Sequence, residues 1–247
     1  NLLKPILLQA PEAFELFNLC AAAYQNIGNV TEAVRHYKRA IEIFPDYPSA
    51  HNNLGLVLAA EGDVSEGIRN IQRAIKLKPD YWDAYLNLIM LLIELGRLED
   101  AEETLTAIEN EDSLYAPCSN NKAVILTERK KLTEAEKLLK AVIKVKPGFL
   151  ESYINLAEIF RLQGRHEKAL VSLNKAIKLD PSNEKVHVAL GNIYREKHLI
   201  DKATSNYEIA LRIEPRSYQA LNNLGLCFMN REANKAIGFF QKAVNIN

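Results

Sequence analysis

Small and large apolar residues recur along the chain with the spacing of amphipathic helices. A larger apolar residue follows four positions after each of the small residues Ala33, Gly67, Ala101, Ala135, Ala169 and Ala203. Residues four apart lie on one face of an α-helix, so each pair marks a buried helix face. Leu-Gly pairs at 54–55, 190–191 and 224–225 mark a second set of helices, in which the glycine lets two helices approach closely. This pattern predicts helices throughout and no strands.

Prolines repeat at one fixed distance along the same pattern. The gaps between successive members of the series are 34, 34, 68, 34 and 34 residues, and Ser113 stands where the double gap omits a proline. The series consists of Pro11, Pro45, Pro79, Pro147, Pro181 and Pro215. Such self-similarity is typical of repeat proteins, in which each hairpin buries its apolar face only by stacking on its neighbours.

Turn residues divide each period into two helices. Gly28, Gly62, Gly96 and Gly164 each follow an apolar helical run, as a C-terminal cap does, and the proline ends the second helix. We take each repeat to begin three residues after its proline, and we expect residues 1–13 to be the second helix of a truncated preceding repeat. The chain then holds seven predicted repeats in one solenoid: 14–47, 48–81, 82–115, 116–149, 150–183, 184–217 and 218–247.

The repeated residues resemble a known family. The tetratricopeptide signature is matched by His187, Leu190, Gly191, Tyr194, Ala203, Tyr207, Ala210 and Pro215. The resemblance implies an all-α, right-handed superhelical solenoid of helix-turn-helix hairpins, whose first helices line a concave groove that receives a peptide or partner segment. Two departures qualify it: the third repeat has residues 109–113 in place of its closing proline, and the fourth has Lys122 where leucine is expected. A third is the shorter turn of the last hairpin, which we expect to be tighter or distorted.

Composition narrows the function mainly by exclusion. Lysine and arginine number 31, as do aspartate and glutamate, so the total charge favours neither a nucleic-acid nor a membrane-surface partner. Three cysteines without a CxxC pair indicate neither a disulfide framework nor a cysteine zinc site, and we expect a reducing, cytoplasmic location. No apolar stretch approaches the roughly 20 residues that cross a bilayer. We therefore expect a protein or peptide ligand, no nucleic acid and no membrane insertion, and we leave open homo-oligomerisation through the terminal repeats.

One polar row runs along the predicted first helices. The sixth position is asparagine in five repeats, at Asn53, Asn87, Asn121, Asn155 and Asn223, and is broken by Leu19 and Ala189. An amide offers donors and an acceptor, so the row would hold the backbone of an extended chain. The row is similar to that in the repeat region of O-linked N-acetylglucosamine transferases. The alternative, equally weighted, is that the amides hydrogen-bond neighbouring helices or are tolerated in solvent.

A charged group accompanies the row in the fifth and sixth repeats. Asn155, Glu158 and Arg161 share a helix face, and Asn192 and Arg195 follow on the next first helix. The two arginines would bind a carboxylate or phosphate by bidentate hydrogen bonds. The favoured alternative is that Glu158 neutralises them.

Catalytic signals are absent from the sequence. The five histidines form no HExxH motif, no GxGxxG, GxxxxGK[ST] or GxSxG motif occurs, and His51 and His187 take places that suit packing. We predict no catalytic residue, no metal and no cofactor. The resulting hypothesis is a non-catalytic interaction scaffold. The alternative is the substrate-recruiting arm of a larger enzyme such as a glycosyltransferase, with the catalytic domain outside this sequence.

Overall fold

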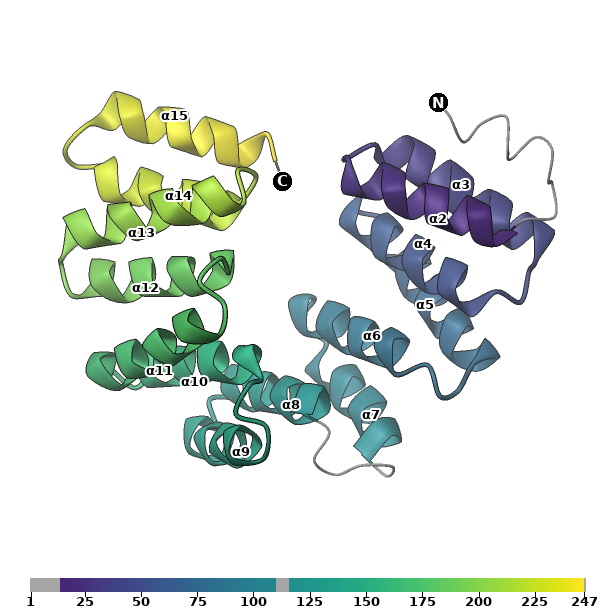
Figure 1. The fold of residues 1–247 in the computed structure, drawn as a ribbon, viewed down its shortest axis with the longest axis horizontal. Helices are drawn as coiled ribbons and strands as arrows, with labels where there is room; N and C mark the ends of the chain where they lie inside the picture. Colours follow the sequence, from purple (N-terminus) through teal and green to yellow (C-terminus); the bar gives the residue numbers. More distant parts are fainter. Residues whose placement is uncertain (1–13, 110–115, 247) are drawn as a thin grey trace. The chain divides into compact units, whose positions relative to one another are not determined.

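The computed structural model describes residues 14–109 and 116–246, and within them the chain is all-α (Figure 1). Helices pair into successive helix-turn-helix units, which confirms the predicted fold class at that level. The first helices are α2 (Phe14–Asn26), α4 (Pro48–Ala60), α6 (Trp82–Glu94), α8 (Ala116–Glu128), α10 (Leu150–Leu162), α12 (Glu184–Glu196) and α14 (Tyr218–Phe228). The second helices are α3 (Val30–Ile43), α5 (Val64–Leu77), α7 (Leu98–Glu109), α9 (Leu132–Val145), α11 (His166–Leu179), α13 (Ile200–Ile213) and α15 (Ala233–Val244). The helix expected at 1–13 and the position of Ser113 lie outside the described residues.

Local sequence sets where the helices begin. The side chains of Asn29 and Asp63 each accept a hydrogen bond from the backbone N–H three residues later, at 3.3 Å, and so cap α3 and α5. Asparagine and aspartate are favoured there because their oxygens satisfy a helix N–H that has no partner within the helix. Pro48 opens α4, where a missing N–H costs nothing.

Left-handed residues close the turns within most hairpins. Gly28, Gly62, Gly96 and Gly164 have φ between 69° and 92°, as predicted for helix caps. Lys130 and His198 take the same role with φ of 61° and 60°, although neither is glycine. At the turn after α8, the N–H of Lys131 donates to the carbonyl of Leu126 at 2.8 Å, the same bond that Asn29 makes to Tyr24 at 2.9 Å.

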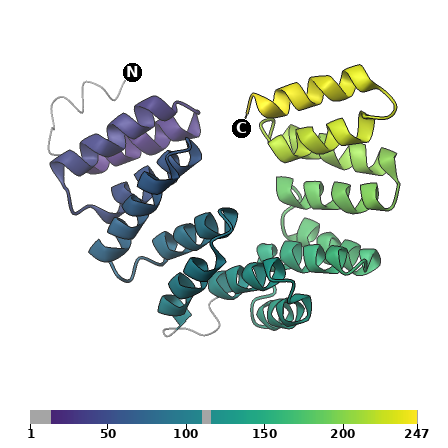
Figure 2. The same ribbon diagram turned by 180° about the vertical axis from the view of Figure 1, so that it is seen from behind.

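The chain divides into two compact units, residues 1–121 (unit 1) and 122–247 (unit 2), which are visible from both sides in Figures 1 and 2. In unit 1 a buried cluster joins α2, α3 and α4 through Ala21, Tyr37 and Leu54. In unit 2 one buried cluster extends from the end of α8 to α12, and a second joins α12, α13 and α14. Within each unit, the hairpins that share a cluster therefore bury apolar surface against one another, as stacking requires.

A polar contact fastens some repeats to the proline that precedes them. The Nε2 of His51 donates to the carbonyl of Pro45 at 2.8 Å, and His187 donates likewise to Pro181 at 3.0 Å. Tyr153, at the equivalent position of α10, donates its hydroxyl to Pro147 at 3.0 Å. The two histidines are thus buried structural residues, in keeping with the packing role predicted for them.

The last hairpin differs from the others. Its first helix, α14, has 11 residues, whereas the first helices of the preceding hairpins have 13. The turn between α14 and α15 comprises the four residues 229–232, whereas the other hairpins have three residues there, so the prediction of a shorter last turn is wrong: the hairpin is shortened in its first helix instead. Phe240 of α15 lies against Gly225.

Candidate functional site

In unit 1 the predicted asparagine row is part of a chain of amides. The Nδ2 of Asn87 on α6 donates to Oδ1 of Asn52 on α4 at 3.0 Å. Asn52 donates to its neighbour Asn53 at 3.1 Å, and Asn53 donates across to Asn18 on α2 at 3.4 Å. The first helices α2, α4 and α6 are therefore joined by amide-to-amide hydrogen bonds that all run in one direction, which is a structural use of these amides.

The four hydrogen-bonded asparagines differ in how exposed they are. Asn18 and Asn52 are buried, whereas Asn53 and Asn87 are half-buried and still reach the surface. Each Nδ2 carries two hydrogens, so one amide bond leaves a second donor. Sequence reasoning missed Asn18 and Asn52 as partners of the row, although both precede the sixth position by one residue and recur 34 residues apart.

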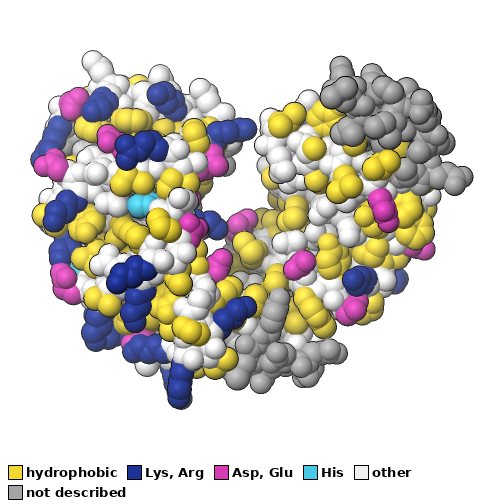
Figure 3. All heavy atoms as spheres, in the orientation of Figure 1, with side chains coloured by type: hydrophobic (Ala, Val, Ile, Leu, Met, Phe, Trp, Pro, Cys, Tyr) yellow, Lys and Arg dark blue, Asp and Glu magenta, His cyan; other side chains and the backbone are white. Residues whose placement is uncertain are grey.

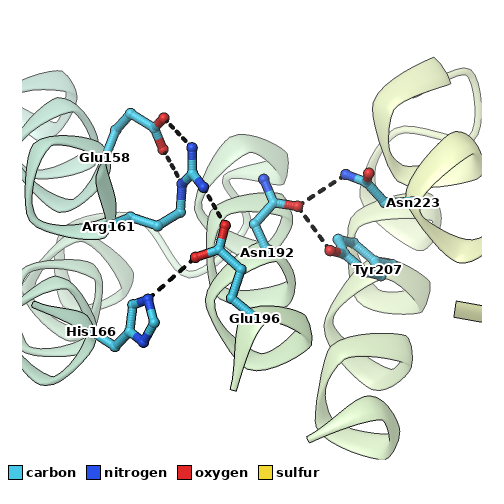
Figure 4. Close-up of polar contacts among 7 residues, drawn as sticks. All are labelled: Glu158, Arg161, His166, Asn192, Glu196, Tyr207 and Asn223. Carbon is cyan, nitrogen blue, oxygen red and sulfur yellow. Dashed lines mark hydrogen bonds and ion pairs between the residues drawn. The ribbon is translucent and has the colours of Figure 1, made fainter. Parts of the chain in front are cut away.

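In unit 2 the row is arranged differently. Asn223 on α14 donates to Oδ1 of Asn192 on α12 at 3.0 Å, and the hydroxyl of Tyr207 donates to the same oxygen at 2.8 Å (Figure 4). Burial raises the pKa of Tyr207 to about 12, so its hydroxyl stays protonated and remains a donor. Asn192 is thereby held by two partners from later helices.

The remaining members of the row lie on α8 and α10. Asn121 is buried, and Asn155 is half-buried. Asn155 lines a small hollow of about 170 Å³ together with Glu158, Val124 and Leu162. A hollow of this size admits one side chain of a partner, not a separate small ligand.

Arg161 is occupied by carboxylates. Its guanidinium donates twice to Glu158, at 2.7 and 2.6 Å, and also donates to Glu196 on α12 (Figure 4). Glu196 in turn faces His166 at 3.3 Å. The hydrogen bond that Arg161 donates to Glu158 is the main reason that the pKa of Arg161 is raised, so its charge is permanent.

This arrangement favours the neutralised alternative for Arg161 but not for Arg195. Arg161 ties α10 to α12 and does not present a free fork to an anion. The Nε of Arg195 is buried without a hydrogen-bond partner in the described residues, and it does not join the cluster around Arg161. Glu196, which the sequence analysis did not select, is the residue that completes the cluster.

The described residues contain no group of three or more His, Cys, Asp or Glu side chains placed to hold a metal ion. No helix in residues 14–109 or 116–246 is long and apolar enough to span a membrane. What the first helices do offer is amides, one neutralised charge cluster and exposed apolar side chains.

Family profiles match most of the chain. A profile described as TPR repeat matches residues 22–62 and 157–198, and two profiles described as tetratricopeptide repeat match 58–116 and 188–246. All three profiles describe the same type of repeat. An architecture built from this repeat alone is typically non-catalytic. No curated protein matches the chain.

Solved structures show the same fold at low identity. A tetratricopeptide repeat protein from Parabacteroides merdae is 16% identical over 92% of this chain and 90% of that one, with a TM-score of 0.81. Pseudomonas aeruginosa PilF is 18% identical over 85% and 95%, with a TM-score of 0.61. YrrB, described as a TPR protein with an unusual peptide-binding site, is 19% identical over 75% and 96%, with a TM-score of 0.51. From these profiles and from its paired helices, the chain is a member of the tetratricopeptide repeat family.

Proposed function

We propose that this chain is a non-catalytic interaction module that binds a peptide or partner segment along its first helices. The observation that carries the proposal is the surface of unit 1, where the half-buried amides of Asn53 and Asn87 accompany exposed apolar side chains. Leu19 takes the place of asparagine on α2 and is 62% exposed, and Met90, one turn from Asn87 on α6, is 49% exposed. Amides that retain a donor suit a peptide backbone, and exposed aliphatic groups suit its apolar side chains.

The family supports an interaction role. Tetratricopeptide repeat proteins generally mediate protein–protein interaction, and YrrB is described as having a peptide-binding site. Fold likeness alone does not name a partner, so the residues of unit 1 have to carry the finer proposal.

The alternative, a substrate-recruiting arm of a larger enzyme such as a glycosyltransferase, rests on the asparagine row alone. In unit 1 that row is engaged in amide-to-amide bonds between helices, which is a structural use. The interaction module is therefore the better-supported proposal, and the sequence of the full-length gene product would separate the two.

A binding measurement tests the proposed surface. Peptides selected from a random display library on the wild-type protein would be labelled, and their Kd measured by fluorescence anisotropy. Met90→Glu should weaken the selected peptides about tenfold or more, because a charge replaces an apolar contact. Ile27→Glu, an equally apolar and more exposed position in a turn of unit 1, is the matched control and should leave Kd unchanged.

Asn87→Ala adds a second arm to the test. It removes an amide of the row, and melting temperatures measured in parallel separate lost binding from lost stability. Selected peptides that bind Met90→Glu, Asn87→Ala and the control equally well would show that the first helices of unit 1 are not the binding surface.

A further inference from the structure

The balanced total charge conceals a division between the two units. Residues 1–121 contain 9 Lys and Arg against 18 Asp and Glu, whereas residues 122–247 contain 22 against 13. The formal charges are therefore −9 and +9. In Figure 3, dark-blue Lys and Arg side chains outnumber magenta ones over the lower left, where α9 and α11 of unit 2 lie. A local field of this kind selects partners even when the whole chain is neutral.

Two successive second helices of unit 2 each present a row of exposed lysines. On α9, Lys137, Ala141 and Lys144 follow one another at the spacing of a single helix face, and all are exposed. On α11 the equivalent positions, each 34 residues later, hold Val171, Lys175 and Lys178, which are also exposed. We call this surface the lysine face; it also includes the exposed Val145 and Leu179. The two helices are linked by Arg165, the residue immediately before α11, which donates to Glu136 of α9 at 2.8 Å.

These lysines lack the carboxylate partners that basic residues have at the equivalent positions of unit 1. Arg35 and Arg69 are each bound by a glutamate one turn away, and Arg73 is bound by Asp46 at 2.8 Å. In the described part of the chain, no carboxylate pairs with Lys137, Lys144 or Lys178. At these positions the basic residues of unit 1 are thus paired within the fold, whereas Lys137, Lys144 and Lys178 of unit 2 have no carboxylate pair in the described residues.

The apolar neighbours of the lysines indicate the kind of partner. Val145, Val171 and Leu179 are 63%, 58% and 44% exposed among the lysines. Neither α9 nor α11 contains an arginine, phenylalanine, tyrosine or tryptophan. Nucleic-acid surfaces use aromatic rings and arginine planes for stacking, and both are missing here. Carboxylates interspersed with aliphatic side chains complement both the charge and the apolar groups.

We propose that the lysine face binds an acidic polypeptide segment that also carries aliphatic side chains. This surface lies on second helices, so it is separate from the first-helix surface proposed above. Its test does not depend on that proposal.

A short fluorescein-labelled peptide of glutamate and leucine is the probe, read by fluorescence anisotropy at low salt. The double variant Lys144→Glu, Lys178→Glu should bind it at least about tenfold more weakly, since two attractive charges become repulsive. The control is Lys185→Glu, Lys242→Glu, which makes the same charge change at exposed positions of α12 and α15 and should bind nearly as the wild type does. Raising the salt should weaken wild-type binding, because exposed charges are screened.

Three results would overturn the proposal. Equal losses in the two double variants would mean that the probe senses only the net charge of unit 2. A single-stranded oligonucleotide or phosphatidylserine vesicles bound more tightly than the peptide, and lost on Lys144→Glu, Lys178→Glu, would assign the face to a different class of partner. If the wild type does not bind the peptide at low salt, an acidic segment is excluded as the partner of the lysine face. Because all four lysines are exposed, circular dichroism and melting should be unchanged in every variant.

Discussion

The imidazole of His36 is buried against the rings of Tyr24 and Phe17, whose centroids are 5.1 and 5.7 Å away. Its Nδ1 has no hydrogen-bond partner in the described residues, and its Nε2 lies 3.2 Å from the guanidinium of Arg35. Burial is the main reason that the pKa of His36 is lowered, Arg35 lowers it further, and Glu32 opposes both. The folded state therefore favours the neutral ring.

Replacing His36 by phenylalanine should reduce the pH dependence of stability. A lowered pKa in the folded state means that the unfolded chain binds the proton more readily, so the wild type is most stable above the unfolded value of about 6.5 and loses stability as the pH falls below it. Melting temperatures at about pH 7.5 and 5.5 should differ less for His36→Phe than for the wild type. Equal differences in the two proteins would contradict the assignment.

Single residues also show where prediction from the sequence ends. The period could place Asn53, Asn87 and Asn223 at one position of successive helices, because periodicity depends on the chain alone. It could not predict that Asn53 bonds to Asn18, or that Arg161 bonds to Glu196, since those pairs depend on the distance between neighbouring helices. The glutamate beside Arg161 was predictable because it lies one helical turn away.

Among the helices, α12 and α13 are a pair whose close approach depends on one residue. A Cβ on Gly191 would overlap the ring of Tyr207, which is fully buried, so only glycine lets that ring lie against the helix backbone. The Leu-Gly pairs of the sequence had predicted such close contacts. Their ring partner was not predicted.

Gly191→Ala should therefore destabilise the protein by about 1–3 kcal/mol, the range for an overpacked core. Gly238→Ala on α15 is the control, because nothing lies within 4 Å of the position that its Cβ would take. Alanine is the better helix former, so the control should be neutral or stabilising by about 0.5–1 kcal/mol. Chemical denaturation would compare them, and equal stability of the two variants would mean that Tyr207 can move aside at little cost.

At the scale of the whole molecule, the fixed period made the all-α fold predictable, because each hairpin repeats one pattern. The charge totals were less informative. Equal numbers of acids and bases suggested no charged partner, yet the two compact units differ in sign. A sum over the chain loses the position of each charge, whereas the lysine face depends on position.

Stacked hairpins should transmit damage only to their neighbours. Stability in such arrays is close to a sum of repeat and nearest-neighbour contributions. In hydrogen exchange followed by mass spectrometry, Gly191→Ala should speed exchange in α12, α13 and the helices that pack on them, while α2 to α5 exchange as in the wild type. Faster exchange in α2 to α5 would show that both units unfold as one.

The turns closed by Lys130 and His198 hold side chains in a conformation that costs roughly 1–2 kcal/mol for residues other than glycine. The four glycine turns avoid this cost. Both of these turns lie in unit 2, one between α8 and α9 and the other between α12 and α13, so backbone strain is distributed unevenly among otherwise equivalent repeats. One substitution by glycine in the turn, outside both helices, would remove this strain from either hairpin.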